Sequence, residues 1–298
     1  MNLSTFTVFK NLNDVKNTIN INDEKLLRIQ NCLLTILDDI IYVCKKYNIE
    51  FISYAGTALG AIRHEGFIPW DDDIDLHMRR CEFKRFVKFF YQELSDKYYI
   101  QDPSSDGDYA LLHGRVRLKG TSYKMREDIG KKIDGIFVDI FILDNTYDNI
   151  ISRNIHGFFC LVGGFLLSCR RFFAERKILF PMINGHKELK NVFVIKSSIG
   201  FLLSFLSVTK WRLFANFIYS FCKNDNSVYL STPSGRKHFF GEMFEREKIC
   251  STSEKKFAGR LLPVPSGYDE YLTKLYGNYM RIPAPEEREK HIVWGFKV

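Results

Sequence analysis

The chain has 298 residues, of which 46% are hydrophobic and 26% are charged, a globular balance that excludes a largely disordered protein. A formal net charge of +8 favours anionic partners: nucleic acid, an anionic membrane surface or a phosphorylated substrate. Seven scattered cysteines without a Cys-x-x-Cys pair indicate reduced thiols and argue against a zinc site or a disulfide scaffold.

The first 22 residues form a polar, Asn-rich segment. They lack the basic start, apolar run and cleavage site of a secretory signal, so we expect the protein to stay in the cytoplasm. The domain proper is predicted over 23–298. It opens with a long amphipathic helix over 24–46, in which Leu26, Leu33 and Leu37 recur at helical spacing.

Helical and strand patterns then alternate along the first half of the chain. Strands show β-branched or alternating apolar residues, and helices repeat apolar residues every three or four positions. This alternation predicts an α/β fold, with a mixed sheet flanked by helices. The expected strands are 49–54, 73–78, 110–118 and 133–143, and the expected helices are 58–64 and 82–94.

The middle of the chain, at about 150–222, is predicted to be a helical apolar insert. Its two apolar runs, 155–169 and 192–209, are shorter than the roughly 20 residues of a membrane-spanning helix. Basic residues surround them, which suits helices lying on an anionic membrane surface. A buried helical layer with a solvated basic rim fits the pattern equally well. The basic residues are Arg170, Arg171, Arg176, Lys177, Lys187, Lys190, Lys196, Lys210 and Arg212.

The segment 70–75, with the sequence WDDDID, places four aspartates within five positions. On a strand, Asp73 and Asp75 project from one face while Ile74 and Leu76 point into the core. Two carboxylates on one face suit a hard divalent cation such as Mg²⁺ or Mn²⁺. A solvated acidic loop is the alternative, but such a loop does not need the alternating apolar residues.

Two further features support chemistry at this cluster. Gly56 and Thr57 lie at a predicted strand-to-helix turn, where backbone N–H groups can bind phosphate. Asp139 lies in the apolar strand 133–143, where a carboxylate is costly unless it is paired or binds a metal. It is therefore either a third metal ligand or the partner of Arg115 or Arg117.

These motifs resemble the signature of the LicD family, which is related to the fukutin proteins. The similarity runs from about residue 24 to 291. One departure is Asn278, where the family usually has aspartate. The matching segments are GTALGAIRHEGFIPWDDDID at 56–75, RVRLKGT at 115–121, GIFVDIFILD at 135–144 and YGNYMRIP at 276–283.

The resemblance implies a nucleotidyltransferase-like fold and a metal-dependent transferase. Its substrates would be a CDP-linked donor, carrying phosphocholine or a similar group, and a hydroxyl of a surface glycan or its lipid-linked precursor. Nucleic acid is not an expected partner. Asp73, Asp75 and Asp139 would be the catalytic, metal-binding carboxylates, and Gly56 with Thr57 the donor-binding turn.

Other side chains are candidates for holding the donor. Arg117 and Lys119, with Arg63, would bind phosphate oxygens. Trp70 could offer an aromatic face to a quaternary ammonium, although core packing is the more common role for such a side chain. Two other functions stay open: a metal-dependent glycosyltransferase that uses a nucleotide-sugar, and a non-catalytic module that binds a glycan or a membrane. The insert would place the enzyme at the inner face of the membrane.

Overall fold

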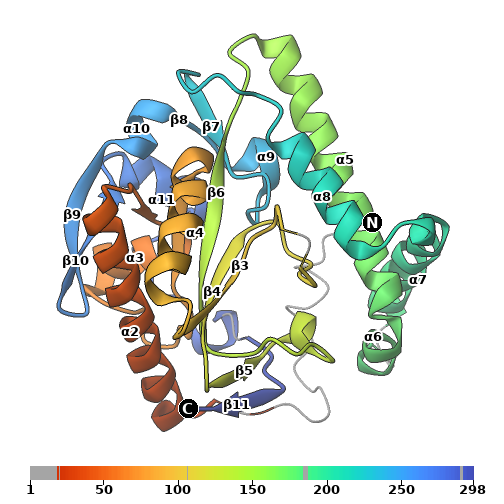
Figure 1. The fold of residues 1–298 in the computed structure, drawn as a ribbon, viewed down its shortest axis with the longest axis horizontal. Helices are drawn as coiled ribbons and strands as arrows, with labels where there is room; N and C mark the ends of the chain where they lie inside the picture. Colours follow the sequence, from red (N-terminus) through yellow and green to blue (C-terminus); the bar gives the residue numbers. More distant parts are fainter. Residues whose placement is uncertain (1–18, 20, 106, 184–186, 289–290) are drawn as a thin grey trace.

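Among the residues that the computed structural model describes (19, 21–105, 107–183, 187–288 and 291–298), a mixed sheet of seven strands forms the centre of the protein (Figure 1). Five strands run in the order β1-β2-β6-β4-β3, and β7 and β8 continue from the end of β6. Only β2 and β6 pair in parallel within it. The strands are β1 (Ile52–Ser53), β2 (Asp75–Arg79), β3 (Tyr98–Gln101), β4 (Gly114–Leu118), β6 (Phe137–Asn145), β7 (Tyr229–Ser231) and β8 (Met243–Glu245).

Helices cover this sheet, so the α/β prediction is confirmed. The first is α2 (Asp23–Tyr47), where the sequence predicted 24–46. Asn22 caps it by accepting a hydrogen bond from the Lys25 amide at 3.1 Å. Its apolar stripe, which includes Ile36 and Ile40, is fully buried in the main core. Outside the insert, the other helices are α3 (Ala55–His64), α4 (Arg80–Leu94), α9 (His238–Gly241), α10 (Arg246–Cys250) and α11 (Tyr268–Tyr276).

Two small hairpin-like pairs complete the domain. Strands β9 (Thr252–Phe257) and β10 (Arg260–Pro265) pair with each other. Near the C-terminus, β11 (Gly295–Lys297) returns to pair with β5 (Ser122–Lys124). This pairing brings the last residues of the chain next to residues 122–124, and Figure 1 shows β11 beside β5.

Several strands are shorter than the sequence predicts. The expected strand 110–118 begins only at Gly114, because the bonds to β6 begin there. A side chain at Gly114 would come within 2.3 Å of the Phe83 ring, so close packing explains the glycine. The expected strand 133–143 begins at Phe137, after Gly135 with its φ of +136°.

The helices of the insert lie to one side of the sheet (Figure 1). They are α5 (Ile150–Ala174), α6 (Arg176–Met182), α7 (Lys187–Leu202) and α8 (Val208–Tyr219). By length and composition, α5 could cross a membrane, and only 28% of its most apolar window is buried. The sequence predicted that both apolar runs are too short to cross a membrane. That prediction fails for the run 155–169, because α5 continues beyond both of its ends. The second run is broken by a 95° bend before α8.

Candidate active site

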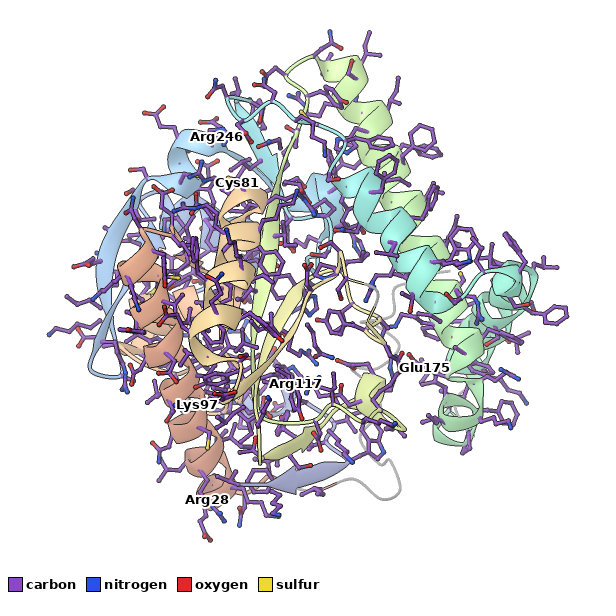
Figure 2. The ribbon with its side chains drawn as sticks, in the orientation of Figure 1. Arg28, Cys81, Lys97, Arg117, Glu175 and Arg246 are labelled. Carbon is purple, nitrogen blue, oxygen red and sulfur yellow. The ribbon has the colours of Figure 1, made fainter. Side chains whose placement is uncertain are left out.

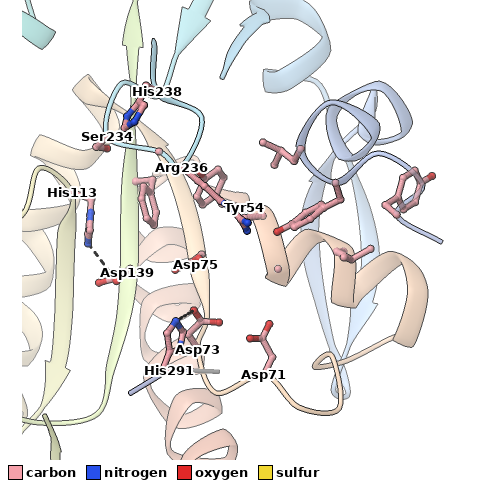
Figure 3. Close-up of a pocket in the computed structure, with 18 of the residues that line it drawn as sticks. Tyr54, Asp71, Asp73, Asp75, His113, Asp139, Ser234, Arg236, His238 and His291 are labelled. Carbon is pink, nitrogen blue, oxygen red and sulfur yellow. Dashed lines mark ion pairs between the residues drawn. The ribbon is translucent and has the colours of Figure 1, made fainter. Parts of the chain in front are cut away.

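A cavity of about 920 Å³ lies against one face of the sheet. The carboxylates around the start of β2 line one end, and Cys160, Leu161 and Gly164 of the insert helix α5 line another part. The loop 233–236, the segment after α11 and residues of α3, α7 and α8 also contribute to its walls. Figure 3 shows the labelled side chains pointing into this space from separate segments of the chain.

Strand register sets the floor of the cavity. Asp75 of β2 stands opposite Asp139 of β6, which stands opposite Arg115 of β4. Phe141 lies two residues after Asp139, and His113 lies two residues before Arg115. Side chains two apart on a strand share a face. The charged side chains Asp75, Asp139 and Arg115 therefore form one row across the strands, and the rings of Phe141 and His113 form the next row. The His113 and Phe141 rings stack, with centroids 4.5 Å apart.

Four aspartates line the cavity, and three of them come from one segment of the chain: Asp71, Asp73 and Asp75. Burial raises the pKa of all three carboxyl groups, and it raises the pKa of Asp71 and Asp75 well above the usual range. The charge of Asp73 raises the pKa of both neighbours further. Buried carboxylates that repel one another are stabilised by a cation, so this cluster is suited to bind one.

The Asp73 and Asp75 pair fits a Mg²⁺ or Mn²⁺ ion in chemistry, because such ions take hard oxygen ligands. Among the described residues, no three His, Cys, Asp or Glu side chains are placed to hold an ion by themselves. Magnesium in enzymes is commonly held by one or two carboxylates together with substrate phosphates, so a pair is sufficient once substrate is bound.

Asp139 is paired with an arginine. Its Oδ1 accepts a hydrogen bond from Arg115 Nε at 2.6 Å, and its Oδ2 accepts one from Arg115 Nη2 at 2.9 Å. His113 Nε2 lies 3.4 Å from Oδ2. Burial acts to raise the pKa of Asp139, but the Arg115 charge, followed by that of His113, outweighs it and holds the pKa well below the usual range. The structure therefore shows the arginine pairing that the sequence left as the alternative to metal binding.

Gly56 and Thr57 lie in the first turn of α3 rather than before the helix, because α3 already begins at Ala55. Gly56 lines the cavity, and a Cβ atom there would come within 2.9 Å of Asp71 Oδ2. Thr57 is buried and fixes the backbone of a site residue, since its Oγ1 accepts a hydrogen bond from the Asp75 amide at 2.8 Å.

The structure does not gather the predicted phosphate-binding cations. Arg63 lines the cavity, but its Nη1 donates to the Tyr279 carbonyl and so holds the C-terminal segment. Arg117 is fully buried and donates to Asp128 at 2.6 Å, outside the cavity lining. Lys119 Nζ donates to a backbone carbonyl at the end of α4, also outside it.

Side chains from the C-terminal segment close one side of the cavity. The guanidinium of Arg288 lies 4.1 Å from the centroid of the Trp70 ring, so one face of that ring is already covered. His291 Nδ1 lies 2.6 Å from Asp72 Oδ1, and its Nε2 lies 3.8 Å from Asp73. Burial would lower the pKa of His291, but the charge of Asp72 raises it well above the usual range.

Comparisons with known proteins fit this site. A family model described as "LicD/FKTN/FKRP, nucleotidyltransferase domain" matches residues 48–158. A Haemophilus influenzae protein named lipopolysaccharide cholinephosphotransferase LicD is 28% identical over 277 residues, covering 87% of this chain and 92% of its own length. The family model thus places a LicD-type domain at residues 48–158, and the similarity to the Haemophilus influenzae protein extends along most of the chain.

Two other relatives share shorter stretches with this chain. An uncharacterized protein of Rickettsia typhi is 36% identical over 63 residues, or 20% of each chain. An uncharacterized protein of Rickettsia prowazekii is 43% identical over 44 residues, or 15% of this chain and 16% of its own. The family model covers α3, β2, β4 and β6, which supply the acidic end and floor of the cavity.

Three further residues belong to the cavity, and the sequence singled out only one of them, Asn278, as a departure from the family pattern. Asp71 lies in the acidic segment 70–75, but the sequence did not mark it as a site residue. The signal that could have pointed to it is Gly56, whose missing side chain leaves room for the Asp71 carboxylate. His113 carries no local signal, because only the pairing of β4 with β6 brings it to Asp139. Asn278, which replaces the usual family aspartate, also lines the cavity, so its position is part of the site.

Proposed function

We propose that this protein is a LicD-type phosphotransferase that moves phosphocholine onto a hydroxyl of lipopolysaccharide or a related surface glycan. The observation that carries the proposal is the acidic cavity itself, built by the same segments that resemble the family. The similarity to the Haemophilus influenzae lipopolysaccharide cholinephosphotransferase extends over most of both chains and supports the reaction and the acceptor class.

The proposed donor is a CDP-linked alcohol, and the proposed cofactor is Mg²⁺ or Mn²⁺ held by Asp73 and Asp75. When bound, the ion would neutralise charge on the diphosphate as CMP leaves. Asp71 lines the same cavity, but it is not placed to complete a three-carboxylate site, so the remaining ligands would be substrate phosphate oxygens. Asp139 is left out of the proposed ligands because Arg115 engages both of its oxygens.

A choline group requires aromatic faces around its quaternary ammonium. The cavity offers several such faces besides Trp70, whose ring is partly covered by Arg288. We place the choline group among these other rings but away from Phe141, whose ring already packs against Tyr54 and His113. The aromatic residues of the lining, besides Trp70, are Tyr54, Phe141, Phe165, Tyr219, Tyr276 and Tyr279.

The insert is the proposed contact with the inner face of the membrane. Its helices expose large apolar side chains: Phe158 of α5 is 59% exposed, Phe201 of α7 is 60% and Phe217 of α8 is 61%. Figure 2 shows side chains projecting outward along this edge of the molecule. Apolar surface with a basic fringe suits the headgroup region of an anionic bilayer. The exposed basic residues are Arg176, Lys177, Lys190 and Lys210.

Not every basic residue of the insert belongs to this fringe. Lys196 is 2% exposed and donates to Ser168, and Arg212 is fully buried and donates to the Tyr109 carbonyl. The insert thus combines the two arrangements that the sequence left open. Its inner side packs as a buried layer, and its outer side supplies the proposed membrane contact. A lipid-linked acceptor held there would reach the cavity past Leu161 of α5.

The test is a donor panel. Purified protein is incubated with Mg²⁺, a choline-free lipopolysaccharide and CDP-choline, CDP-ethanolamine, CDP-glycerol, CDP-ribitol or nucleotide-sugars, and released nucleotide is measured with the modified glycan. We expect acceptor-dependent CMP release with CDP-choline. Transfer from a nucleotide-sugar alone would instead assign a glycosyltransferase, and no transfer from any donor would leave a binding module.

A further inference from the structure

His113 occupies a defined place on the cavity floor that the proposed donor and cation sites do not use. Its side chain is 13% exposed and its ring lines the cavity. One face of the ring stacks on Phe141 with an interplanar angle of 27°. Tyr109 fixes the backbone by donating a hydrogen bond from its hydroxyl to the His113 carbonyl at 2.9 Å. The ring is therefore packed on one face, and the backbone that carries it is fixed.

The partner of the ring is a carboxylate. His113 Nε2 faces Asp139 Oδ2 at 3.4 Å, and Figure 3 shows the two side chains pointing toward each other. The contact is at ion-pair distance and does not have hydrogen-bond geometry. A carboxylate that faces Nε2 still favours the tautomer with the hydrogen on Nε2, which leaves the lone pair on Nδ1. A carboxylate that orients an imidazole in this way is the arrangement found behind histidine bases in many enzymes.

Other candidates for taking a proton are less suited. Asp73 and Asp75 would hold the cation, whose charge favours the ionised form and weakens them as bases. His291 faces carboxylates with both ring nitrogens, Asp72 with Nδ1 at 2.6 Å and Asp73 with Nε2 at 3.8 Å, so neither nitrogen is left for a hydroxyl. The position of His113 also suits the acceptor, because the same cavity is lined by α5 of the insert, along which we propose that the acceptor arrives.

We propose that His113 is the general base of the transfer reaction and that Asp139 positions its ring. This inference rests on the proposed function. The acceptor hydroxyl oxygen forms a bond to the phosphorus that carries choline, and the bond from that phosphorus to the bridging oxygen breaks. CMP leaves with the electron pair. The hydroxyl proton passes to His113 Nδ1 and is later released to water.

The arginine pair of Asp139 supports this division of roles. Arg115 holds Asp139 ionised through two hydrogen bonds, so the carboxylate keeps its charge while the neighbouring ring gains a proton. The charge then stabilises the imidazolium that the reaction forms. Arg115 itself is 2% exposed and fixed between strands, which gives the Asp139 carboxylate a single orientation.

The test compares His113→Ala with His64→Gln, a substitution outside the cavity lining. General bases contribute about 10²–10⁴-fold, so we expect His113→Ala to lower kcat by about 100-fold or more without a comparable rise in the KM for CDP-choline. Imidazole added to His113→Ala is expected to restore part of kcat. His64→Gln is expected to transfer at the wild-type rate.

The outcomes separate this inference from the proposed function. A wild-type enzyme that transfers from no donor overturns both. An active wild type whose His113→Ala form keeps its kcat, or loses it without imidazole rescue while CMP still binds, overturns the base role alone. If His113→Ala does not fold, His113→Gln replaces it, because the amide keeps much of the packing on Phe141 and cannot act as a base.

Discussion

Replacing Asp139 with asparagine tests what holds the centre of the site together. The change removes one charge from a pair in which Arg115 is 2% exposed and Asp139 is 8% exposed. Removing one partner of a buried pair typically costs about 3–5 kcal/mol, because the other charge stays buried. Arg115 keeps a weaker contact with Glu127 at 3.4 Å, so we expect the lower end, about 3 kcal/mol.

The assay is thermal unfolding without divalent metal. For a chain of this size, about 3 kcal/mol corresponds to a fall in Tm of roughly 6 °C or more. The matched control is Asp38→Asn, which removes a surface pair with Arg260 and is expected to cost about 0–1 kcal/mol.

The same variant should change the dependence of stability on pH. The folded pKa of Asp139 lies below its unfolded value. Its contribution to stability is therefore present above the unfolded pKa, near 4, and is lost as the pH falls through the folded pKa. Asp139→Asn should therefore lose less folding stability than the wild type as the pH falls below about 4. The reasoning is refuted if Asp139→Asn unfolds like wild type without metal but loses its stabilisation by Mg²⁺, since Asp139 would then be a metal ligand.

Three other substitutions test the remaining proposals. Asp73→Asn is expected to abolish transfer and stabilisation by Mg²⁺ while the fold survives, and full activity in excess chelator would contradict the metal requirement. Gly56→Ala places a methyl group 2.9 Å from Asp71 Oδ2 and is expected to lower Mg²⁺-dependent activity, whereas wild-type kinetics would show that the carboxylate can move aside at no cost. Phe217→Glu should weaken binding to anionic liposomes by about tenfold or more, since burying one Phe is worth about 1.5–3 kcal/mol. The matched control is Leu261→Glu on β10, a residue 56% exposed, and equal binding by both variants would argue against a membrane contact through the insert.

The sequence alone determined the features that depend on local spacing. Period-two alternation identified β2, although the strand begins at Asp75 and Asp73 and Ile74 precede it. Ile74 and Leu76 are fully buried as expected. Helical periodicity identified α2 and α4, and the glycine and aspartate spacing identified the family resemblance. These predictions succeed because backbone geometry sets how often side chains return to the same face of a helix or strand. This repeat does not depend on which other element packs against it.

Tertiary structure decided which groups meet. Arg115 and Arg117 are two residues apart and look alike in sequence, yet one pairs with Asp139 and the other with Asp128. His113 becomes a site residue only because antiparallel pairing of β4 with β6 sets it beside Asp139. The identity of a partner depends on contacts between residues distant in the chain, and neither composition nor local period carries that information.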